Sequence, residues 1–213
     1  SSARRRQLLE HAARHDAVII EDDYDSASNF TLNPLPALKA SDRSGRVVYV
    51  SSLSKALSPG LRLGFMVADP VLIDEARALR RLVYRHPPTN IQYQMAHFLA
   101  QGHYETHLRR YHYDSAQRWE RLHAALQRYL PSCRALAGSE HANAFWLQTP
   151  AQINTQQLTW RAAHAGVLIE PGARHFLSAA PPDNYFRMGF HAINPDAIAQ
   201  GVEVLRGQLE QMG

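Results

Sequence analysis

The sequence predicts an α/β fold in which part of a large domain with a mainly parallel sheet precedes a smaller α+β domain. Three observations support this prediction. Short runs rich in β-branched and aromatic residues, bounded by turn residues, are typical of buried strands. Amphipathic segments come before and after these runs, as in α/β domains. From about residue 90 the pattern changes to one long amphipathic segment followed by mixed elements. We therefore expect two domains, residues 1–100 and residues 101–213.

The first region begins with an expected helix at residues 2–15, where leucines and alanine lie on one side and arginines on the other. The buried strands that we expect to follow are residues 17–20, 47–50 and 63–67. Asp69 and Pro70 then predict the start of another helix, because aspartate is a favoured N-cap and proline a favoured first helical residue.

The second region begins with a long amphipathic helix expected at residues 103–130, where apolar and aromatic residues recur at steps of three and four. The elements expected next are strands at 144–147, 167–170 and 185–190 and a helix at 155–165. A final helix should begin at Asn194 and Pro195. The residues expected on its inner side are Ile198, Val202, Leu205 and Leu209.

Composition excludes several classes of protein. The single cysteine, Cys133, rules out an internal disulfide and fits the reducing cytoplasm. No apolar run reaches the ~18 residues needed to span a membrane, so we expect no membrane partner. The net charge is +4, but the arginines form no stripe interleaved with aromatics, and no helix-turn-helix spacing is visible. This segment is therefore expected to be cytoplasmic and not itself to bind nucleic acid.

An acid and a phenol end the first expected strand. Because strand side chains alternate, Asp22 and Tyr24 should share one face, and Asp23 should point to the other. The carboxyl end of a strand is where open α/β sheets bind ligands. A capping or turn cluster is the competing interpretation of these three residues alone.

A polar loop follows the second expected strand and contains Ser52, Ser54, Lys55 and Arg62. Serine hydroxyls and arginine can hold a phosphate, and a lysine beside them can act as an amine nucleophile. A solvated surface loop is the alternative. Ser52 and Lys55 also match the Ser-x-x-Lys motif of penicillin-binding proteins, but the other elements of that family are absent.

An arginine interrupts the apolar strand expected at 185–190. Burial of Arg187 would require an anionic partner, either a substrate carboxylate or a protein carboxylate, and the strand alone favours neither. Histidines spaced four apart (His11 and His15, His103 and His107) have metal-site spacing, but no third ligand is in reach, so we interpret them as helix-surface residues and predict no metal site.

Taken together, these motifs closely resemble the MocR family, bacterial GntR-type transcription regulators whose C-terminal domain is similar to a fold-type I aminotransferase. The strong motifs are residues 21–26, residues 34–38 and the Ser-x-Ser-Lys loop that ends in residues 61–64. Weaker ones are residues 170–172 and 186–190. The resemblance covers only the second half of the aminotransferase-like domain, with its large-domain part followed by the small domain.

The resemblance implies that pyridoxal 5'-phosphate is the cofactor. It implies that Asp22 pairs with the pyridinium nitrogen, that Tyr24 binds the ring 3-hydroxyl and that Lys55 forms the internal aldimine. The same comparison assigns the phosphate to Ser52, Ser54 and Arg62, and it assigns the carboxylate of an incoming amino acid to Arg187.

The function implied is an effector-sensing domain of a regulator, which binds an amino acid or amine, forms a homodimer and contacts DNA only through a winged-helix domain absent from this chain. The alternatives are a catalytically active class I/II aminotransferase that uses the same residues, and a structural remnant that binds nothing. The phosphate loop and ring-stacking aromatic of the first half are also absent. We therefore expect this fragment to act in regulation rather than in transamination.

Overall fold

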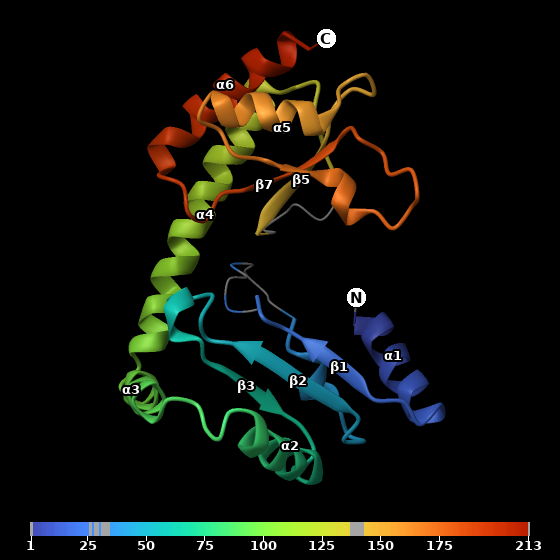
Figure 1. Ribbon diagram of the computed structural model, residues 1–213, viewed down its shortest axis with the longest axis vertical. Helices are drawn as coiled ribbons and strands as arrows, with labels where there is room; N and C mark the ends of the chain where they lie inside the picture. The colour runs from blue at the N-terminus through green and yellow to red at the C-terminus, as the bar shows by residue number, and fades with distance from the viewer. Residues whose placement is uncertain (1, 26, 28–29, 31–34, 137–142, 213) are drawn as a thin grey trace. The chain divides into compact units, whose positions relative to one another are not determined.

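The computed structural model describes residues 2–25, 27, 30, 35–136 and 143–212 (Figure 1). The motif residues Ser26 and Pro34 lie outside this description. The chain divides into two compact units, Ser1–Tyr111 and His112–Gly213. The division falls inside helix α4 (His103–Tyr129), whereas the sequence analysis placed it before that helix. A continuous helical pattern cannot reveal that the first turns of a helix pack with one unit and the later turns with another.

The first unit contains a three-stranded sheet in the order β1-β2-β3, formed by β1 (Ile19–Asp22), β2 (Val47–Ser52) and β3 (Gly64–Val67). Strands β1 and β2 are parallel, so their carboxyl ends lie at the same edge. Strand β3 is antiparallel to β2, which makes the described part of the sheet mixed. The α/β class is confirmed, but the direction of β3 was not expected.

Burial differs among these three strands, although all three were expected to be buried. Val47 and Val48 in the central strand β2 are buried. By contrast, Ile20 in β1 is 72% exposed and Val67 in β3 is 45% exposed. The reason is their place in the sheet, since β1 and β3 each pair with only one strand among the described residues.

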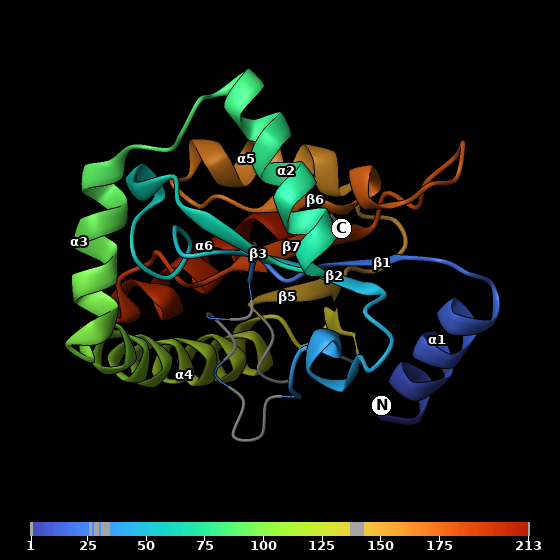
Figure 2. The ribbon, with the colours of Figure 1, turned by 90° about the horizontal axis from the view of Figure 1, so that it is seen from below.

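Among the described residues, three α-helices lie wholly in the first unit: α1 (Ser2–Arg14), α2 (Pro70–Val83) and α3 (Thr89–Ala100). The first two were predicted. The Asp69 side chain caps α2 by accepting a hydrogen bond from the backbone N–H of Val71 at 3.0 Å. Helix α3 was missed because Pro88 at its N-cap makes no side-chain cap hydrogen bond. Figure 2 shows α2 and α3 as separate helices joined by residues 84–88.

The second unit contains a four-stranded antiparallel sheet and the rest of α4. The strand order is β4 (Arg134–Ala135), β5 (Ala144–Gln148), β7 (Tyr185–Gly189) and β6 (Glu170–Pro171). Its other helices are α5 (Thr155–His164) and α6 (Ile198–Glu210). The strand expected at 167–170 is wrong in extent, because only Glu170 and Pro171 pair with β7.

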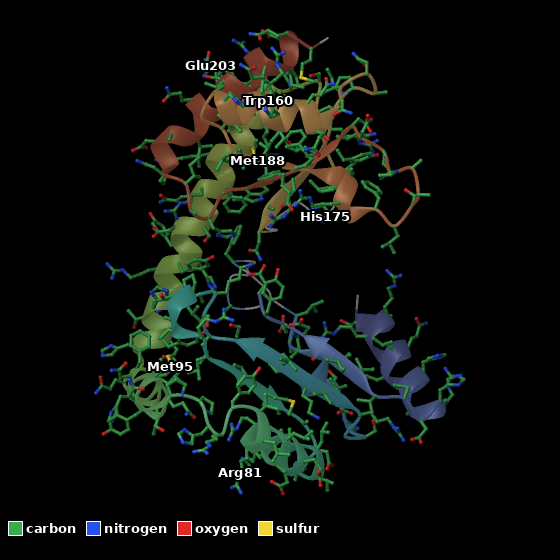
Figure 3. The ribbon with its side chains drawn as sticks, viewed as in Figure 1. Arg81, Met95, Trp160, His175, Met188 and Glu203 are labelled. Atoms are coloured by element: carbon green, nitrogen blue, oxygen red, sulfur yellow. The ribbon has the colours of Figure 1, made fainter. Side chains whose placement is uncertain are left out.

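The core of this unit lies between the sheet and helices α5 and α6, which lie side by side over it (Figure 1). Its buried residues come from alternate strand positions and from the inner helix faces. They include Phe145, Leu147, Phe186, Met188 (labelled in Figure 3), Leu158, Ile198, Val202, Leu205 and Leu209. Each fully buried large apolar side chain contributes about 1.5–3 kcal/mol, so this packing holds strand β7 firmly in place. None of the described helices is both long and apolar enough to cross a membrane.

Candidate functional site

The carboxyl end of β1 presents its acids on two different faces. The Asp23 carboxylate accepts a hydrogen bond from the Tyr49 hydroxyl at 3.0 Å, and its backbone N–H donates to Val50 at 2.9 Å. Asp23 is thus held against β2. Asp22 and Tyr24 are exposed, and the Asp22 carboxylate has no ion pair among the described residues. Asp22 is therefore available to a ligand, while Asp23 already has a structural partner.

The loop after β2 is held by hydrogen bonds to the segment that leads into β3. The backbone N–H of Leu53 donates to the Leu63 carbonyl at 3.0 Å, and the N–H of Leu63 donates to the Ser54 hydroxyl at 3.1 Å. Ser54 is buried, so its hydroxyl serves the loop itself. Ser52 is partly exposed and accepts a bond from the Ser54 N–H at 3.2 Å. Of the two serines, Ser52 is the better placed for a ligand.

Gly64 in the Leu-Arg-Leu-Gly motif allows the close approach of β3 to β2. A Cβ at this position would lie 2.8 Å from the carbonyl oxygen of Ser51. Because that oxygen belongs to the backbone of the neighbouring strand, it cannot move aside cheaply. The glycine therefore keeps the two ends of the loop together.

Lys55 lies in this loop and contacts residues from the segment after β1. Its ammonium group is 2.9 Å from Oδ1 of Asp25 and 4.6 Å from the centre of the Tyr24 ring. The folding of the loop thus brings together the lysine and the phenol singled out from the sequence. Lys39, the other lysine of the chain, pairs with Asp42 at 3.1 Å.

Arg62 is the basic residue at the end of the loop. It follows the short 3-10 helix Pro59–Leu61 and adopts a left-handed backbone with φ of 48°. Its side chain is exposed and makes no ion pair with any described residue. An unpaired guanidinium on a constrained backbone can bind an anion such as a phosphate.

Arg187 lies in the second unit and has a protein partner. Burial alternates along β7, and Arg187 lies on the exposed side rather than in the apolar interior. Its guanidinium is 3.3 Å from Oε2 of Glu170, the residue opposite it on β6. The other oxygen of Glu170 is 3.4 Å from His175 (labelled in Figure 3) and 3.9 Å from Arg174. One carboxylate therefore serves three basic side chains.

Gly172 helps to hold the pair of Glu170 and Arg187 in place. A Cβ on Gly172 would lie 2.6 Å from the carbonyl oxygen of Tyr185, so only glycine allows the chain after β6 to pack this closely on β7. The Glu-Pro-Gly motif, recognised only as a weak resemblance, has a physical role here. It keeps Glu170 beside Arg187.

Four residues of these sites were missed from the sequence. Asp25 and Glu21 belong to the acidic motif and Glu170 to the Glu-Pro-Gly motif, but the sequence analysis assigned none of them a role. Glu21 accepts hydrogen bonds from the backbone of Leu38 and Lys39 at 2.5 and 2.8 Å. It thus joins the acidic motif to the Pro-rich one. The fourth residue is His107, which the sequence analysis interpreted as a helix-surface residue; it is partly buried, and its ring nitrogen Nε2 is 2.6 Å from the carbonyl oxygen of Ala56, the residue after Lys55.

The residues of the first unit fit the demands of pyridoxal phosphate. The cofactor needs an amine for its aldehyde, an acid for its ring nitrogen and cations or hydroxyls for its phosphate. Lys55 supplies the amine and Asp22 an exposed carboxylate. Arg62 and Ser52 supply a cation and a hydroxyl. Asp22 and Ser52 end β1 and β2, whose carboxyl ends share one edge of the sheet, and Lys55 and Arg62 lie in the loop after β2.

Known proteins resemble this chain over nearly its whole length. The model of the family described as aminotransferase class I and II matches residues 3–205. The HTH-type transcriptional regulator TauR of Rhodobacter capsulatus is 39% identical over 201 residues, which are 93% of this chain and 41% of the relative. The probable rhizopine catabolism regulatory protein MocR of Rhizobium meliloti is 34% identical over 95% of the chain and 41% of its own length. These relatives confirm the resemblance to MocR-type regulators.

Solved structures show the same fold. Kynurenine aminotransferase from Pyrococcus horikoshii, solved in complex with PMP, superposes with a TM-score of 0.86 at 26% identity. The match covers 98% of this chain and 52% of that enzyme. The α-aminoadipate aminotransferase LysN from Thermus thermophilus, complexed with N-(5'-phosphopyridoxyl)-L-leucine, gives 0.85 at 25% identity over 100% of this chain and 55% of its own. The chain thus spans about two fifths to one half of the proteins that it matches.

Proposed function

The chain belongs to the aminotransferase class I and II family, and from this premise we propose that it is the pyridoxal-phosphate-binding, effector-sensing part of a MocR-type transcription regulator. In this role the domain binds an amino acid or amine and passes the change in occupancy to a DNA-binding domain elsewhere in the protein. The proposal concerns the whole protein. The similar regulators are more than twice as long as this chain.

One observation carries the proposal. The chain combines the Lys55, Tyr24 and Asp25 cluster with 39% identity to a named transcriptional regulator over nearly its whole length. The cluster supports cofactor binding, and the identity supports regulation. The aminotransferases among the solved structures are less similar, at 25–27% identity in three of them.

Three side chains in this unit would hold the ring of the cofactor. Bound pyridoxal phosphate supplies an aldehyde for amines and a ring that withdraws electrons. Lys55 would supply the amine that attaches to it covalently, and Tyr24, whose ring lies beside the Lys55 ammonium, would donate its hydroxyl hydrogen to the cofactor. Asp22, exposed and unpaired among the described residues, would pair with the ring nitrogen and keep its proton in place.

The phosphate would be held by Ser52 and Arg62. Both lie in the loop around Lys55, and the Arg62 guanidinium has no protein anion to compensate it among the described residues. Ser54 was also assigned to the phosphate on the family resemblance. Its buried hydroxyl and its bond to Leu63 support a role in shaping the loop instead.

Arg187 would bind the carboxylate of the effector. Its exposed guanidinium can form two parallel hydrogen bonds with a carboxylate, provided that Glu170 moves away or shares the arginine with it.

The resemblance to the regulators also supports a homodimer that acts in the cytoplasm and contacts DNA through a separate winged-helix domain.

A catalytically active aminotransferase is the second candidate. It is supported by the solved relatives that cover 98% or more of this chain and are named as aminotransferases. Both candidates use the same cofactor-binding residues. They differ in whether the bound amino compound is converted.

The experiment uses the full-length protein with pyridoxal phosphate and a panel of amino acids and amines. Binding to DNA from its own upstream region is measured by gel shift, and amino-group transfer to pyruvate or 2-oxoglutarate is measured in parallel. An amino compound that changes DNA affinity without sustained transfer supports the regulator. Sustained transfer with unchanged DNA affinity would replace it with the aminotransferase. A Lys55→Ala variant that responds like the wild type would contradict both.

A further inference from the structure

His107 on helix α4 contacts the loop that carries Lys55. Its ring nitrogen Nε2 lies 2.6 Å from the carbonyl oxygen of Ala56, although the two residues are 51 positions apart in the sequence. Ala56 directly follows Lys55 and is 4% exposed. Because a carbonyl oxygen only accepts, Nε2 must carry a hydrogen and donate it. Both the Nε2–H tautomer and the imidazolium can do so.

The contact occurs on the side of Lys55 where the loop has the fewest other supports. Before Lys55, hydrogen bonds to Leu63 fix Leu53 and Ser54. After it, the bond from His107 satisfies the buried Ala56 carbonyl, and no other partner of this oxygen is found among the described residues. A buried carbonyl that loses its partner is unfavourable, so the backbone after Lys55 would shift toward another arrangement.

Other roles for His107 fit the structure less well. Its i, i+4 partner His103 packs its ring 5.6 Å from Phe98 and is exposed. No group of three metal-binding side chains lies together within the described ranges. His107 is partly buried, with its ring stacked on Tyr111 at 6.4 Å, which is not the environment of a solvated surface residue. The geometry favours a fixed donor.

We propose that His107 is a positioning residue for Lys55, holding the backbone after the lysine so that its amine stays beside Tyr24 and Asp25. The inference deepens the proposed function and rests on it, because it concerns the residue that would attach the cofactor. Helix α4 continues from this contact into the second unit, where Ser115, Leu122 and Leu126 are buried. The long helix is thus tied directly to the lysine loop.

The test uses full-length protein and the variants His107→Ala, His107→Gln and His103→Ala. Glutamine can donate from Nε2, whereas alanine cannot. The first readout needs no cofactor: Lys55 and Lys39 are labelled with an amine-acylating reagent, and each site is quantified by peptide mapping. Lys39 serves as an internal reference for general unfolding, because it is held in its own ion pair with Asp42.

We expect His107→Ala to raise the labelling of Lys55 relative to Lys39 several-fold and to weaken covalent capture of pyridoxal phosphate about tenfold. His107→Gln should restore most of both, and His103→Ala should match the wild type. An unchanged labelling ratio in His107→Ala, or a glutamine variant as impaired as alanine, overturns the positioning role. A wild-type protein that never captures the cofactor on Lys55 would instead overturn the proposed function. The labelling ratio would still test whether His107 positions Lys55.

Discussion

The ammonium group of Lys55 lies 2.9 Å from the carboxylate of Asp25. Both side chains are partly exposed, 36% for Lys55 and 25% for Asp25. The sequence analysis identified the lysine but not its counter-ion. The amine is therefore paired with a carboxylate, and this contact must be given up before the nitrogen can form a new bond.

Lys55 is expected to be the site of covalent attachment. Of the two lysines in the chain, Lys39 is held by Asp42, whereas Lys55 lies beside Tyr24. Borohydride reduction of the cofactor-loaded full-length protein, followed by peptide mapping, should place the pyridoxyl group on Lys55. The Lys55→Ala variant should show none in this chain. A pyridoxyl group on Lys39 with Lys55 unmodified would contradict the assignment.

Asp25→Asn should speed this attachment. The substitution removes the anion that holds the ammonium, and exposed ion pairs are worth ~0–1 kcal/mol, so the rate should rise by about two- to fivefold. Stopped-flow absorbance at neutral pH measures it. Asp16→Asn is the matched control, because Asp16 lies before the amino end of β1 and forms an ion pair with Arg46. A slower rate in Asp25→Asn would mean that Asp25 helps the lysine rather than restrains it.

Asp22 and Asp23 should differ in their effects on cofactor affinity. Asp22→Ala removes a charged partner of the ring nitrogen and should weaken binding by ~2 kcal/mol or more, about thirtyfold. Asp23→Ala should leave cofactor affinity nearly unchanged, because its carboxylate is bonded to Tyr49. It should instead lower thermal stability. Spectral titration and thermal unfolding of both variants separate the effects, and equal losses of affinity would show that the strand faces are misassigned.

Arg187 and Glu170 should act in opposite directions on an effector that carries a carboxylate. Arg187→Ala should weaken its binding by ~2–3 kcal/mol, since a charge-assisted pair of hydrogen bonds is lost. Glu170→Gln should strengthen it several-fold by removing the competing carboxylate 3.3 Å away. Spectral titration with an amino acid and with the corresponding amine measures both.

The corresponding amine lacks the carboxylate, so its affinity should change little in both Arg187→Ala and Glu170→Gln. Arg206→Ala is the matched control: this arginine is 44% exposed, against 43% for Arg187, and pairs with acids on its own helix. Effects of Arg187→Ala that are equal for the acid and the amine would reject the carboxylate-binding role.

Asp42 should make the fold sensitive to acid. Burial raises the pKa of its carboxyl, but hydrogen bonds from Val47, Lys39 and Ser44 outweigh burial and hold the pKa well below the ordinary value of 3.8. A lowered pKa contributes stability that is present above the ordinary pKa and is lost as pH falls through the folded-state pKa. The free energy of unfolding should therefore fall below about pH 4.

Asp42→Asn should flatten this acid dependence and lower the free energy of unfolding by about 1–3 kcal/mol at neutral pH. The reason is that a side chain with no exposed surface loses hydrogen bonds. Denaturant unfolding across the acid range is the measurement. Asp74→Asn, at an exposed aspartate on α2 that pairs with Arg77, is the control. An Asp42→Asn profile as steep as that of the wild type would remove Asp42 as the source.

Local signals in the sequence were enough for several elements. Asp69 with Pro70 predicted the start of α2 correctly, and Asn194 with Pro195 begins a short 3-10 helix (Pro195–Ala197) that leads into α6 at Ile198. Both could be predicted because a cap depends on side-chain and backbone groups only a few residues apart. The inner face of α6 was also confirmed, since helical spacing alone determines which residues share a side. The α/β class and the family could also be recognised from short motifs, because each motif consists of residues that are close together in the sequence.

Tertiary structure decided what the local pattern could not. The antiparallel direction of β3, the short β6 and the partner of Arg187 all depend on which distant segments lie side by side. The bond from His107 to Ala56 joins residues 51 apart, so no spacing in the sequence could reveal it. The sequence by itself determined which chemical groups are present and where the helices with a side-chain cap, such as α2, begin. The folded chain decided which of these groups face each other, because such contacts are made between residues that only tertiary packing brings within hydrogen-bonding distance.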